Sequence, residues 1–215
     1  MNEPRQALAD ARLYLVCDAL SDHFLERAIR GGVEIVQLRM KSASDEDIVA
    51  AGRRFSAVCS ANGVVLILND RPDLVPATGA DGVHVGQDDV PVADARRLVG
   101  VTRIVGLSTH TPEQIDAAAR DPDIDYIGVG PVQATPTKPG RPAVGLELVG
   151  YAAAHAATPF FAIGGLNRDN AASVRAAGGR RIAVVRALTE AEDPEQAARD
   201  LRSAIDSELG VGAAR

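Results

Sequence analysis

The chain has 215 residues, of which 46% are hydrophobic and 24% are charged, values typical of one globular domain with a sizeable core. Its formal net charge of −6 argues against a nucleic-acid-binding surface, and its 3% aromatic content, without tryptophan, argues against a platform for stacking bases. The two cysteines, Cys17 and Cys59, fit no zinc-ligand spacing, so we expect two buried thiols in a reducing compartment.

The first twelve residues are polar and lack the apolar segment of a signal peptide, and no apolar run approaches the ~18 residues of a membrane span. We therefore expect a cytoplasmic protein that binds small molecules and has neither a membrane nor a nucleic acid as partner. The outer helices predicted below would also allow a homo-oligomer.

Short apolar segments rich in valine and isoleucine recur along the chain and alternate with longer helical patterns. Their nearly continuous apolar character is typical of strands that are buried on both faces of a parallel sheet. The eight predicted strands are 13–18, 33–39, 64–70, 82–86, 103–108, 126–130, 160–165 and 181–187.

The intervening segments carry helix start and stop signals. Ser44 with Asp47, the segment 111–114 and the segment 193–196 each place a capping side chain before a helical pattern, the last two with proline at the first helical position. Glycines follow five of the helical patterns, at Gly31, Gly63, Gly79, Gly100 and Gly178.

Eight strand–helix units in one chain of this length predict the α/β class and a single-domain (β/α)8 TIM barrel. The domain would comprise residues 1–215, with the barrel from about 12 to 209, a short polar N-terminal extension and a flexible C-terminal tail. An open doubly wound sheet is the alternative, but no glycine-rich dinucleotide loop follows the first strand.

Catalytic groups of such barrels lie at the carboxyl ends of the strands. After the second strand, Gln37, Arg39 and Lys41 alternate and would face one side, a pattern that suits a polyanion but also describes a solvated strand end. Asp70 and Asp89 follow the third and fourth strands, where two carboxylates could hold one Mg²⁺ or could simply cap helices.

The fifth strand ends at Ser108, which could bind an oxyanion or a ring nitrogen. His110 follows it and is a candidate general base, although a histidine with a structural role is the more common case. We assign His84, within the fourth strand, a structural role, and no Ser-His-Asp arrangement is indicated.

The longest irregular stretch, 131–147, follows the sixth strand, and a connection of this length is usually functional. Within it, residues 135–138 (Thr-Pro-Thr-Lys) offer two hydroxyls and a cation that could hold a phosphate. The pair Gly164-Gly165 and the end of the eighth strand at Val185-Arg186 follow the two strands after which many barrels bind phosphate.

These segments together resemble the thiamine-phosphate synthase (thiamine-phosphate pyrophosphorylase) family over nearly the whole chain, from Leu13 to about Leu209. The motifs that carry the resemblance occur in order: QLRMK (37–41), ND (69–70), GVHVGQDD (82–89), GLSTHT (106–111), DYIGVGPVQATPTK (125–138), AIGGLNRDNA (162–171) and AEDPEQAAR (191–199).

The resemblance implies an Mg²⁺-dependent transferase that condenses hydroxymethylpyrimidine diphosphate with hydroxyethylthiazole phosphate, giving thiamine phosphate and pyrophosphate. It assigns Asp70 and Asp89 to the metal. It assigns the pyrimidine diphosphate to Gln37, Arg39, Lys41, Asn69, Ser108 and Lys138. Four of these residues are implied to be catalytic: Arg39, Lys41, Ser108 and Lys138. Leu38 and Met40 are implied to belong to the same lining segment. It assigns the thiazole phosphate to Thr135, Thr137, Gly165, Val185 and Arg186, with Pro136 in the phosphate loop.

The chain departs from the family pattern at Arg186, where many relatives carry serine, so a direct charge contact to the phosphate would replace a hydroxyl contact. Three functions compete with the synthase. A phosphate-binding aldolase would need a Schiff-base lysine that projects into the barrel, whereas Lys41 neighbours Arg39 at a strand end. A thiazole tautomerase-like isomerase tends to place a histidine after the sixth strand, where this chain has Pro131. A non-catalytic barrel that binds thiazole phosphate would release no pyrophosphate.

Overall fold

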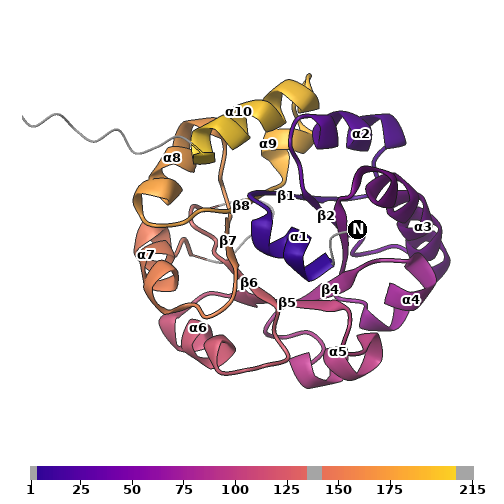
Figure 1. Cartoon of the computed structure of the whole chain (residues 1–215), viewed down its shortest axis with the longest axis horizontal. Helices are drawn as coiled ribbons and strands as arrows, with labels where there is room; N and C mark the ends of the chain where they lie inside the picture. The colour runs from indigo at the N-terminus through magenta and orange to yellow at the C-terminus, as the bar shows by residue number, and fades with distance from the viewer. Residues whose placement is uncertain (1–3, 135–141, 207–215) are drawn as a thin grey trace, which may run out of the picture.

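The computed structural model describes residues 4–134 and 142–206, which form a closed barrel of parallel strands surrounded by helices (Figure 1). Each strand pairs with the next in the chain, and β1 also pairs with β8, so the sheet has no free edge. The strands are β1 (Leu13–Cys17), β2 (Ile35–Leu38), β3 (Val65–Asn69), β4 (Gly82–Val85), β5 (Ile104–Thr109), β6 (Tyr126–Val129), β7 (Phe160–Ile163) and β8 (Ile182–Val184). The predicted fold class is confirmed, and each predicted strand segment contains an observed strand or overlaps one.

The helices begin where the capping signals predicted. Ser44, Thr111 and Asp193 each accept a hydrogen bond from the backbone N–H three residues ahead. The helices are α1 (Pro4–Asp10), α2 (Asp22–Arg30), α3 (Asp45–Asn62), the 3₁₀ turn η1 (Pro72–Leu74), α4 (Val75–Thr78), α5 (Val92–Val99), α6 (Pro112–Ala119), α7 (Gly145–His155), α8 (Arg168–Ala176), α9 (Arg186–Thr189) and α10 (Pro194–Asp206).

At two of the boundaries that differ from the sequence prediction, a helix begins inside a segment predicted to be strand or irregular. The predicted eighth strand extended to residue 187, but β8 stops at Val184 and α9 begins at Arg186. The predicted irregular stretch extended to residue 147, but α7 begins at Gly145. In both places an apolar run continues from an irregular segment or a strand into a helix, and hydrophobicity alone does not mark such a transition.

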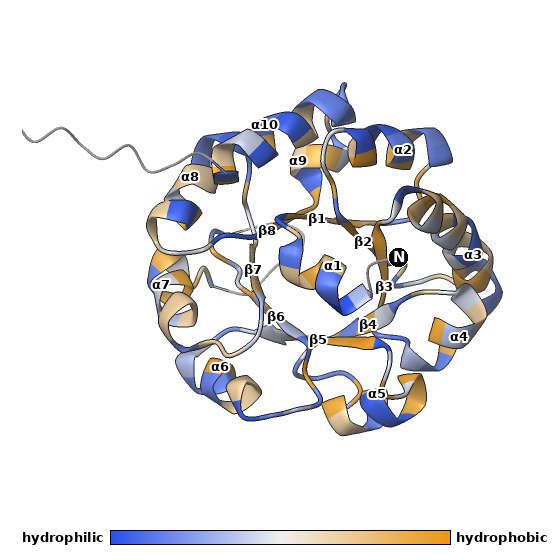
Figure 2. Ribbon diagram, in the orientation of Figure 1, coloured by the Kyte–Doolittle hydropathy of each residue, from blue (hydrophilic) through white to orange (hydrophobic). Residues whose placement is uncertain are grey.

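The core has two compartments because strand side chains alternate between the two faces of the barrel wall. The outer compartment lies between the strands and the helices, and it contains Leu38 and Phe55. The inner compartment lies within the barrel and contains Tyr14, Tyr126 and Phe161. Figure 2 shows hydrophobic strands at the centre and many hydrophilic residues on outer helices such as α2 and α10.

The N-terminal segment closes one end of the barrel. It was predicted to be a polar extension, but it forms α1, which lies across the centre of the ring of strands in Figure 1. Leu8 and Ala11 are buried among the inner residues of the barrel, and Arg5 forms an ion pair with Asp125. A segment of seven residues with few apolar positions does not predict a helix by its pattern.

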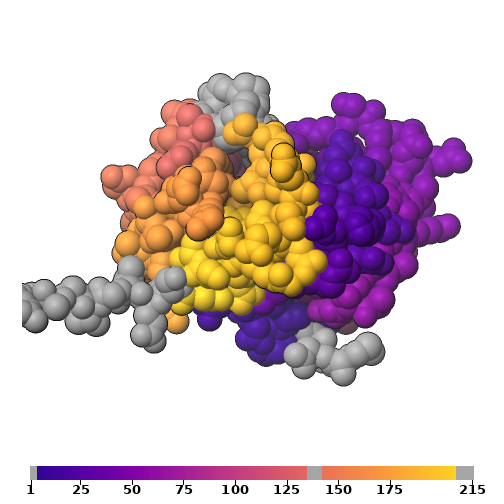
Figure 3. Space-filling model, turned by 90° about the horizontal axis from the view of Figure 1, so that it is seen from above, coloured from indigo at the N-terminus to yellow at the C-terminus, as the bar shows by residue number. Residues whose placement is uncertain are grey.

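The last helix returns to the first units of the barrel. α10 packs against both α2 and α8, and in Figure 3 the C-terminal residues, in yellow, lie directly against the N-terminal residues, in indigo. Ion pairs between Arg30 and Glu195 and between Arg27 and Asp193 join α2 to the α10 region. The helical ring therefore closes like the sheet inside it. Within residues 4–134 and 142–206, no helix is long and apolar enough to cross a membrane.

Candidate active site

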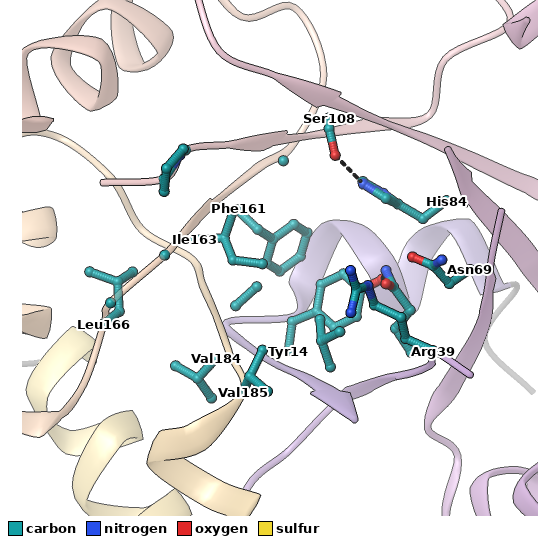
Figure 4. Close-up of a pocket in the computed structure, with 18 of the residues that line it drawn as sticks. Tyr14, Arg39, Asn69, His84, Ser108, Phe161, Ile163, Leu166, Val184 and Val185 are labelled. Carbon is teal, nitrogen blue, oxygen red and sulfur yellow. Dashed lines mark hydrogen bonds between the residues drawn. The ribbon is translucent and has the colours of Figure 1, made fainter. Parts of the chain in front are cut away.

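A cavity of about 360 Å³ opens at the carboxyl ends of the strands, at the end of the barrel opposite α1. Figure 4 shows residues from several strands pointing into it, among them Arg39, Asn69 and Ser108. Ten of the predicted site residues line this one cavity: Gln37, Arg39, Lys41, Asn69, Asp70, Asp89, Ser108, Gly165, Val185 and Arg186.

Two predicted side chains lie elsewhere. Leu38 is 1% exposed and packs in the outer core, and Met40 packs against that same core. Neither lines the cavity, because both alternate with Gln37, Arg39 and Lys41 and therefore face the other side of the strand. Thr135, Pro136, Thr137 and Lys138 lie outside the described residues.

Asp70 and Asp89 bring two carboxylates together at the rim. Burial of the Asp70 carboxyl, together with the negative charge of the neighbouring Asp89, raises the pKa of Asp70 above its ordinary value, whereas the positive charge of Lys41 opposes the shift. Nδ2 of Asn69 donates to Oδ2 of Asp70 over 2.5 Å, and the backbone N–H of Gly86 donates to Oδ2 of Asp89 over 2.8 Å. Asp70 also adopts a left-handed backbone with φ of 59°, which is uncommon for a residue other than glycine.

These two carboxylates fit a magnesium ion. Mg²⁺ is commonly held by one or two carboxylates, with water and substrate phosphate completing an octahedral shell. A cation between Asp70 and Asp89 would also relieve the repulsion that raises the pKa of Asp70. The described part of the chain contains no group of three or more His, Cys, Asp or Glu residues suited to a metal, so water and substrate phosphate would supply the remaining ligands.

The end of β2 supplies positive charge beside the carboxylates. The backbone N–H of Arg39 donates to the carbonyl of Cys17 over 2.8 Å, which extends the pairing of β2 with β1 past Leu38. The chain therefore stays extended, and the side chains of Gln37, Arg39 and Lys41 all reach the cavity as the alternation predicted. Arg39 is half-buried and Lys41 is exposed, so the charge is greatest toward the rim.

The floor of the cavity contains polar residues that the sequence analysis did not assign to the site. Tyr14, His84 and Tyr126 line it, with Phe161 beside them. Nε2 of Gln37 donates to the Tyr14 hydroxyl over 2.6 Å, and Nε2 of His84 lies 2.9 Å from Oγ of Ser108 (Figure 4). The alternation of strand side chains could have identified the two tyrosines. Tyr14 lies two residues from Val16 on the same face of β1, and Tyr126 lies two residues from Gly128 on the same face of β6.

His110 lines the cavity with its ring held by the backbone. Nδ1 of His110 lies 2.5 Å from the carbonyl oxygen of Gly130, and its backbone N–H donates to Oε1 of Gln114 over 2.7 Å. The ring is therefore anchored between the ends of β5 and β6. His110 thus lies at the cavity, and its structural role stays a prediction.

The loop after β7 lies against the start of the loop after β6. A Cβ atom on Gly164 would lie 2.5 Å from Cα of Pro131, and one on Gly165 would lie 2.7 Å from Cβ of Gln133. Both glycines have positive φ, and the backbone N–H of Gln133 donates to the carbonyl of Gly164 over 3.0 Å. Glycine is thus required here for the two backbones to approach each other.

This contact places the described end of the sixth loop at one wall of the cavity. Gly164 and Gly165 line that wall together with Asn167, which caps α8, and with Val185 and Arg186. Val185 precedes the short helix α9, and Arg186, at the start of α9, is exposed. The cavity therefore has a carboxylate and cation side near β2 to β4 and a glycine and arginine side near β7 and β8.

The sequence matches known proteins of one activity. The profile of the family described as thiamine monophosphate synthase matches residues 13–188. A thiamine-phosphate synthase of Thermobifida fusca is 49% identical over 204 residues, covering 92% of this chain and 94% of that protein. A thiamine-phosphate synthase of Thermus thermophilus is 50% identical over 181 residues, covering 84% of this chain and 86% of that protein.

A solved structure of a protein with the same activity shares the fold. The structure of a thiamine phosphate pyrophosphorylase from Pyrococcus furiosus superimposes with a TM-score of 0.85 at 30% identity, covering 96% of this chain and 99% of that one. The family resemblance drawn from the sequence motifs is therefore confirmed by the profile, by the curated relatives and by the fold. The chain belongs to the thiamine monophosphate synthase family.

Proposed function

We propose that this protein is a transferase that condenses hydroxymethylpyrimidine diphosphate with hydroxyethylthiazole phosphate, giving thiamine phosphate and pyrophosphate. The observation that carries the proposal is the division of one cavity into two anion-binding sides. Arg39 and Lys41 lie beside the Asp70 and Asp89 carboxylates on one side, and the Gly165 and Arg186 wall forms the other. Two substrates with separate phosphate groups fit such a cavity.

The pyrimidine diphosphate would bind on the β2 to β5 side. Arg39 can hold two phosphate oxygens with its planar fork, and Lys41 adds a second charge nearby. At an effective dielectric near 20, one close pair of opposite charges contributes at most about 4 kcal/mol before desolvation is subtracted. Gln37, Asn69 and Ser108 would hold the ring and the ester oxygens, with Lys138 as a further cation.

Asp70 and Asp89 would hold Mg²⁺ beside that diphosphate. The bound metal would supply Lewis-acid stabilisation of the departing pyrophosphate. Lys41 and Arg39 act in the same direction, because they face the negative charge that grows on the leaving group. Lys41 also counters the carboxylate charge, since its positive charge opposes the rise in the pKa of Asp70.

The reaction itself needs little from the protein in the way of acid–base chemistry. The bond between the pyrimidine methylene carbon and the diphosphate oxygen breaks, and the electron pair leaves with pyrophosphate. The ring amino group stabilises the resulting cation, and the lone pair of the thiazole nitrogen forms the new carbon–nitrogen bond. The chain therefore has to position two reactants and shield the cation from water. Phe161, Ile163 and Val184 supply apolar surface in the cavity for that purpose (Figure 4).

The thiazole phosphate would bind at the opposite wall. Gly165 and Val185 present backbone there, and Arg186 would contribute a charged contact in place of a hydroxyl. Gln133 and Ala134 lie next to Gly165 and are the last described residues before Thr135, Pro136 and Thr137, which the family resemblance assigns to the same phosphate.

The deciding experiment mixes both substrates with Mg²⁺ and measures pyrophosphate and thiamine phosphate. We expect both products in equal amounts, suppression by EDTA and recovery with added Mg²⁺. Asp89→Ala should lower turnover more than tenfold without unfolding the protein, since it removes one of two metal carboxylates. The matched control is Asp94→Ala, which removes a carboxylate from α5 that pairs only with the exposed Arg97 among the described ion pairs.

Three results would argue against the proposal. Binding of thiazole phosphate without release of pyrophosphate would indicate a non-catalytic binder. Isomerisation of a thiazole substrate without the pyrimidine would indicate the tautomerase alternative. Equal rates for Asp89→Ala and Asp94→Ala would contradict the metal assignment.

A further inference from the structure

A chain of hydrogen bonds crosses the interior of the barrel from Gln37 on β2 to Ser108 on β5. Nε2 of Gln37 donates to the Tyr14 hydroxyl over 2.6 Å, and that hydroxyl lies 2.9 Å from the hydroxyl of Tyr126. The Tyr126 hydroxyl lies 3.0 Å from Nδ1 of His84, whose Nε2 lies 2.9 Å from Oγ of Ser108. The two ends of the chain are residues proposed to bind the pyrimidine substrate, and the three middle residues connect them.

Burial favours the neutral form of the two tyrosines in the middle. Tyr14 is 2% exposed and Tyr126 is 0% exposed, and burial raises the pKa of both phenols well above the ordinary value. A neutral hydroxyl carries one hydrogen, so it can donate to only one neighbour at a time. When Tyr126 donates to His84, it accepts from Tyr14, and when it donates to Tyr14, it accepts from His84.

This restriction links the two ends of the chain. A neutral His84 imidazole allows two directions. In one, Gln37 donates to Tyr14, Tyr14 to Tyr126, Tyr126 to Nδ1 of His84, and Nε2–H of His84 to Ser108. The amide oxygen of Gln37 is then available to accept, and the Ser108 hydroxyl hydrogen is available to donate. In the reverse direction the Gln37 amide turns over, so that its NH₂ group can donate to a ligand while Oγ of Ser108 accepts.

Packing holds the rings of Tyr14 and Tyr126 in place, so a reversal of direction moves only hydrogens and the Gln37 amide. Phe161 packs edge-on against both tyrosine rings, with centroid separations of 5.3 Å to Tyr14 and 5.8 Å to Tyr126. Gly106 leaves the space that the end of the Tyr126 ring fills, because a Cβ atom there would lie 2.6 Å from the Tyr126 hydroxyl oxygen. The absence of a side chain at Gly106 thus lets the Tyr126 hydroxyl occupy this position.

We propose that Tyr126 is a positioning residue that couples Gln37 to Ser108, so that one end of the chain offers an acceptor whenever the other offers a donor. The proposal rests on the proposed function. An aminopyrimidine carries an amino donor and ring-nitrogen acceptors, so a coupled donor and acceptor on two sides of the cavity would select one orientation of the ring. That orientation fixes where the methylene carbon faces the second substrate.

The test measures the Kd of hydroxymethylpyrimidine diphosphate by calorimetry, together with steady-state kinetics for both substrates. Tyr126→Phe keeps the ring and removes the hydroxyl. We expect a Kd and KM for the pyrimidine diphosphate about tenfold higher, with the KM for the thiazole phosphate unchanged. Tyr14→Phe removes the next link and should give the same pattern, which keeps the test valid if Tyr126→Phe fails to fold.

The matched control is Tyr151→Phe, which removes a phenol hydroxyl bound to Asp116 outside the cavity and should leave both constants unchanged. The critical comparison repeats Tyr126→Phe in a protein variant that already carries Gln37→Ala and Ser108→Ala. If Tyr126 acts only through these two ends, the substitution should then change the Kd less than twofold.

The outcomes separate the two proposals. A wild-type protein that neither binds nor converts the pyrimidine diphosphate would overturn the proposed function and this inference with it. A wild-type protein that forms thiamine phosphate, together with a Tyr126→Phe variant of unchanged Kd, would overturn the coupling alone. A tenfold effect that persists without Gln37 and Ser108 would show that Tyr126 contacts the ligand or shapes the cavity, and it would also overturn the coupling.

Discussion

Arg96 on α5 donates through Nη2 to Oδ2 of Asp125 over 2.6 Å, and both side chains are largely withdrawn from solvent. The same guanidinium donates to the backbone carbonyls of Gly100, Arg103 and Asp123. One side chain on the outer ring therefore satisfies the turns that precede β5 and β6, at the end of the barrel away from the cavity.

Arg96→Ala should destabilise the protein by about 3–5 kcal/mol, because it leaves a buried carboxylate and several carbonyls without this donor. Arg97→Ala is the control, since Arg97 is 75% exposed and pairs with Asp94 on the surface, and it should change stability by at most about 0.5 kcal/mol. Urea unfolding of the two variants measures the difference. Equal midpoints would contradict a structural role for Arg96.

Asp70→Asn should stabilise the metal-free protein at neutral pH. The folded pKa of Asp70 lies above the ordinary carboxyl value of 3.8, so its contribution to stability is complete below that value and is lost as the pH rises through the folded pKa. Asparagine removes the charge and tolerates the left-handed backbone at this position. Thermal midpoints from pH 3 to pH 8 should therefore diverge as the pH rises.

The control for this pH series is Asp45→Asn. The hydrogen bond from Arg71 lowers the pKa of Asp45, so its contribution is present above the ordinary carboxyl value and is lost as the pH falls. Its substitution should not stabilise the protein at neutral pH. Added Mg²⁺ should raise the midpoint of the wild type and leave that of Asp70→Asn nearly unchanged, and an equal rise in both would contradict the metal assignment.

Gly106→Ala should both destabilise the protein and weaken substrate binding. The added Cβ would lie 2.2 Å from Cζ of Tyr126, so the ring or the strand must move, at a cost of about 1–3 kcal/mol. Gly150→Ala is the control, because Gly150 lies within α7 and its Cβ would meet only the carbonyl oxygen of Ala177, at 3.7 Å. Differential scanning calorimetry should find Gly150→Ala unchanged or up to about 1 kcal/mol more stable.

Leu8→Ala should lower stability by about 2–5 kcal/mol while leaving kcat unchanged at temperatures where the protein stays folded. Leu8 is 2% exposed beneath the barrel, away from the reacting groups. Leu98→Ala serves as the control, since Leu98 is 48% exposed on α5. A large fall in kcat for Leu8→Ala would show that α1 influences the cavity directly.

Much of the fold follows from local sequence signals. The valine- and isoleucine-rich runs located eight strands, and Ser44, Thr111 and Asp193 located three helix starts, because strand burial and capping are properties of short segments. α1 was not predicted as a helix, since its stability comes from burying Leu8 under a barrel that only the whole chain forms.

The site could be predicted where its residues alternate at strand ends. Gln37, Arg39 and Lys41 were assigned to one face by that rule, and the same rule removes Leu38 from the cavity. Tyr14 and Tyr126 were not identified, because a strand tyrosine in an apolar run looks like ordinary core until its hydroxyl has a partner. The cytoplasmic location and a homo-oligomeric state stay predictions.

The helix α1 across the base of the barrel affects how reactants enter the cavity and how products leave it. With α1 at one end and the aromatic floor above it, the cavity is closed at its base. Among the described residues, α1 and the aromatic floor leave the strand ends as the route by which both reactants enter and both products depart. A bound product would block the next substrate, so product release must precede substrate binding in every catalytic cycle.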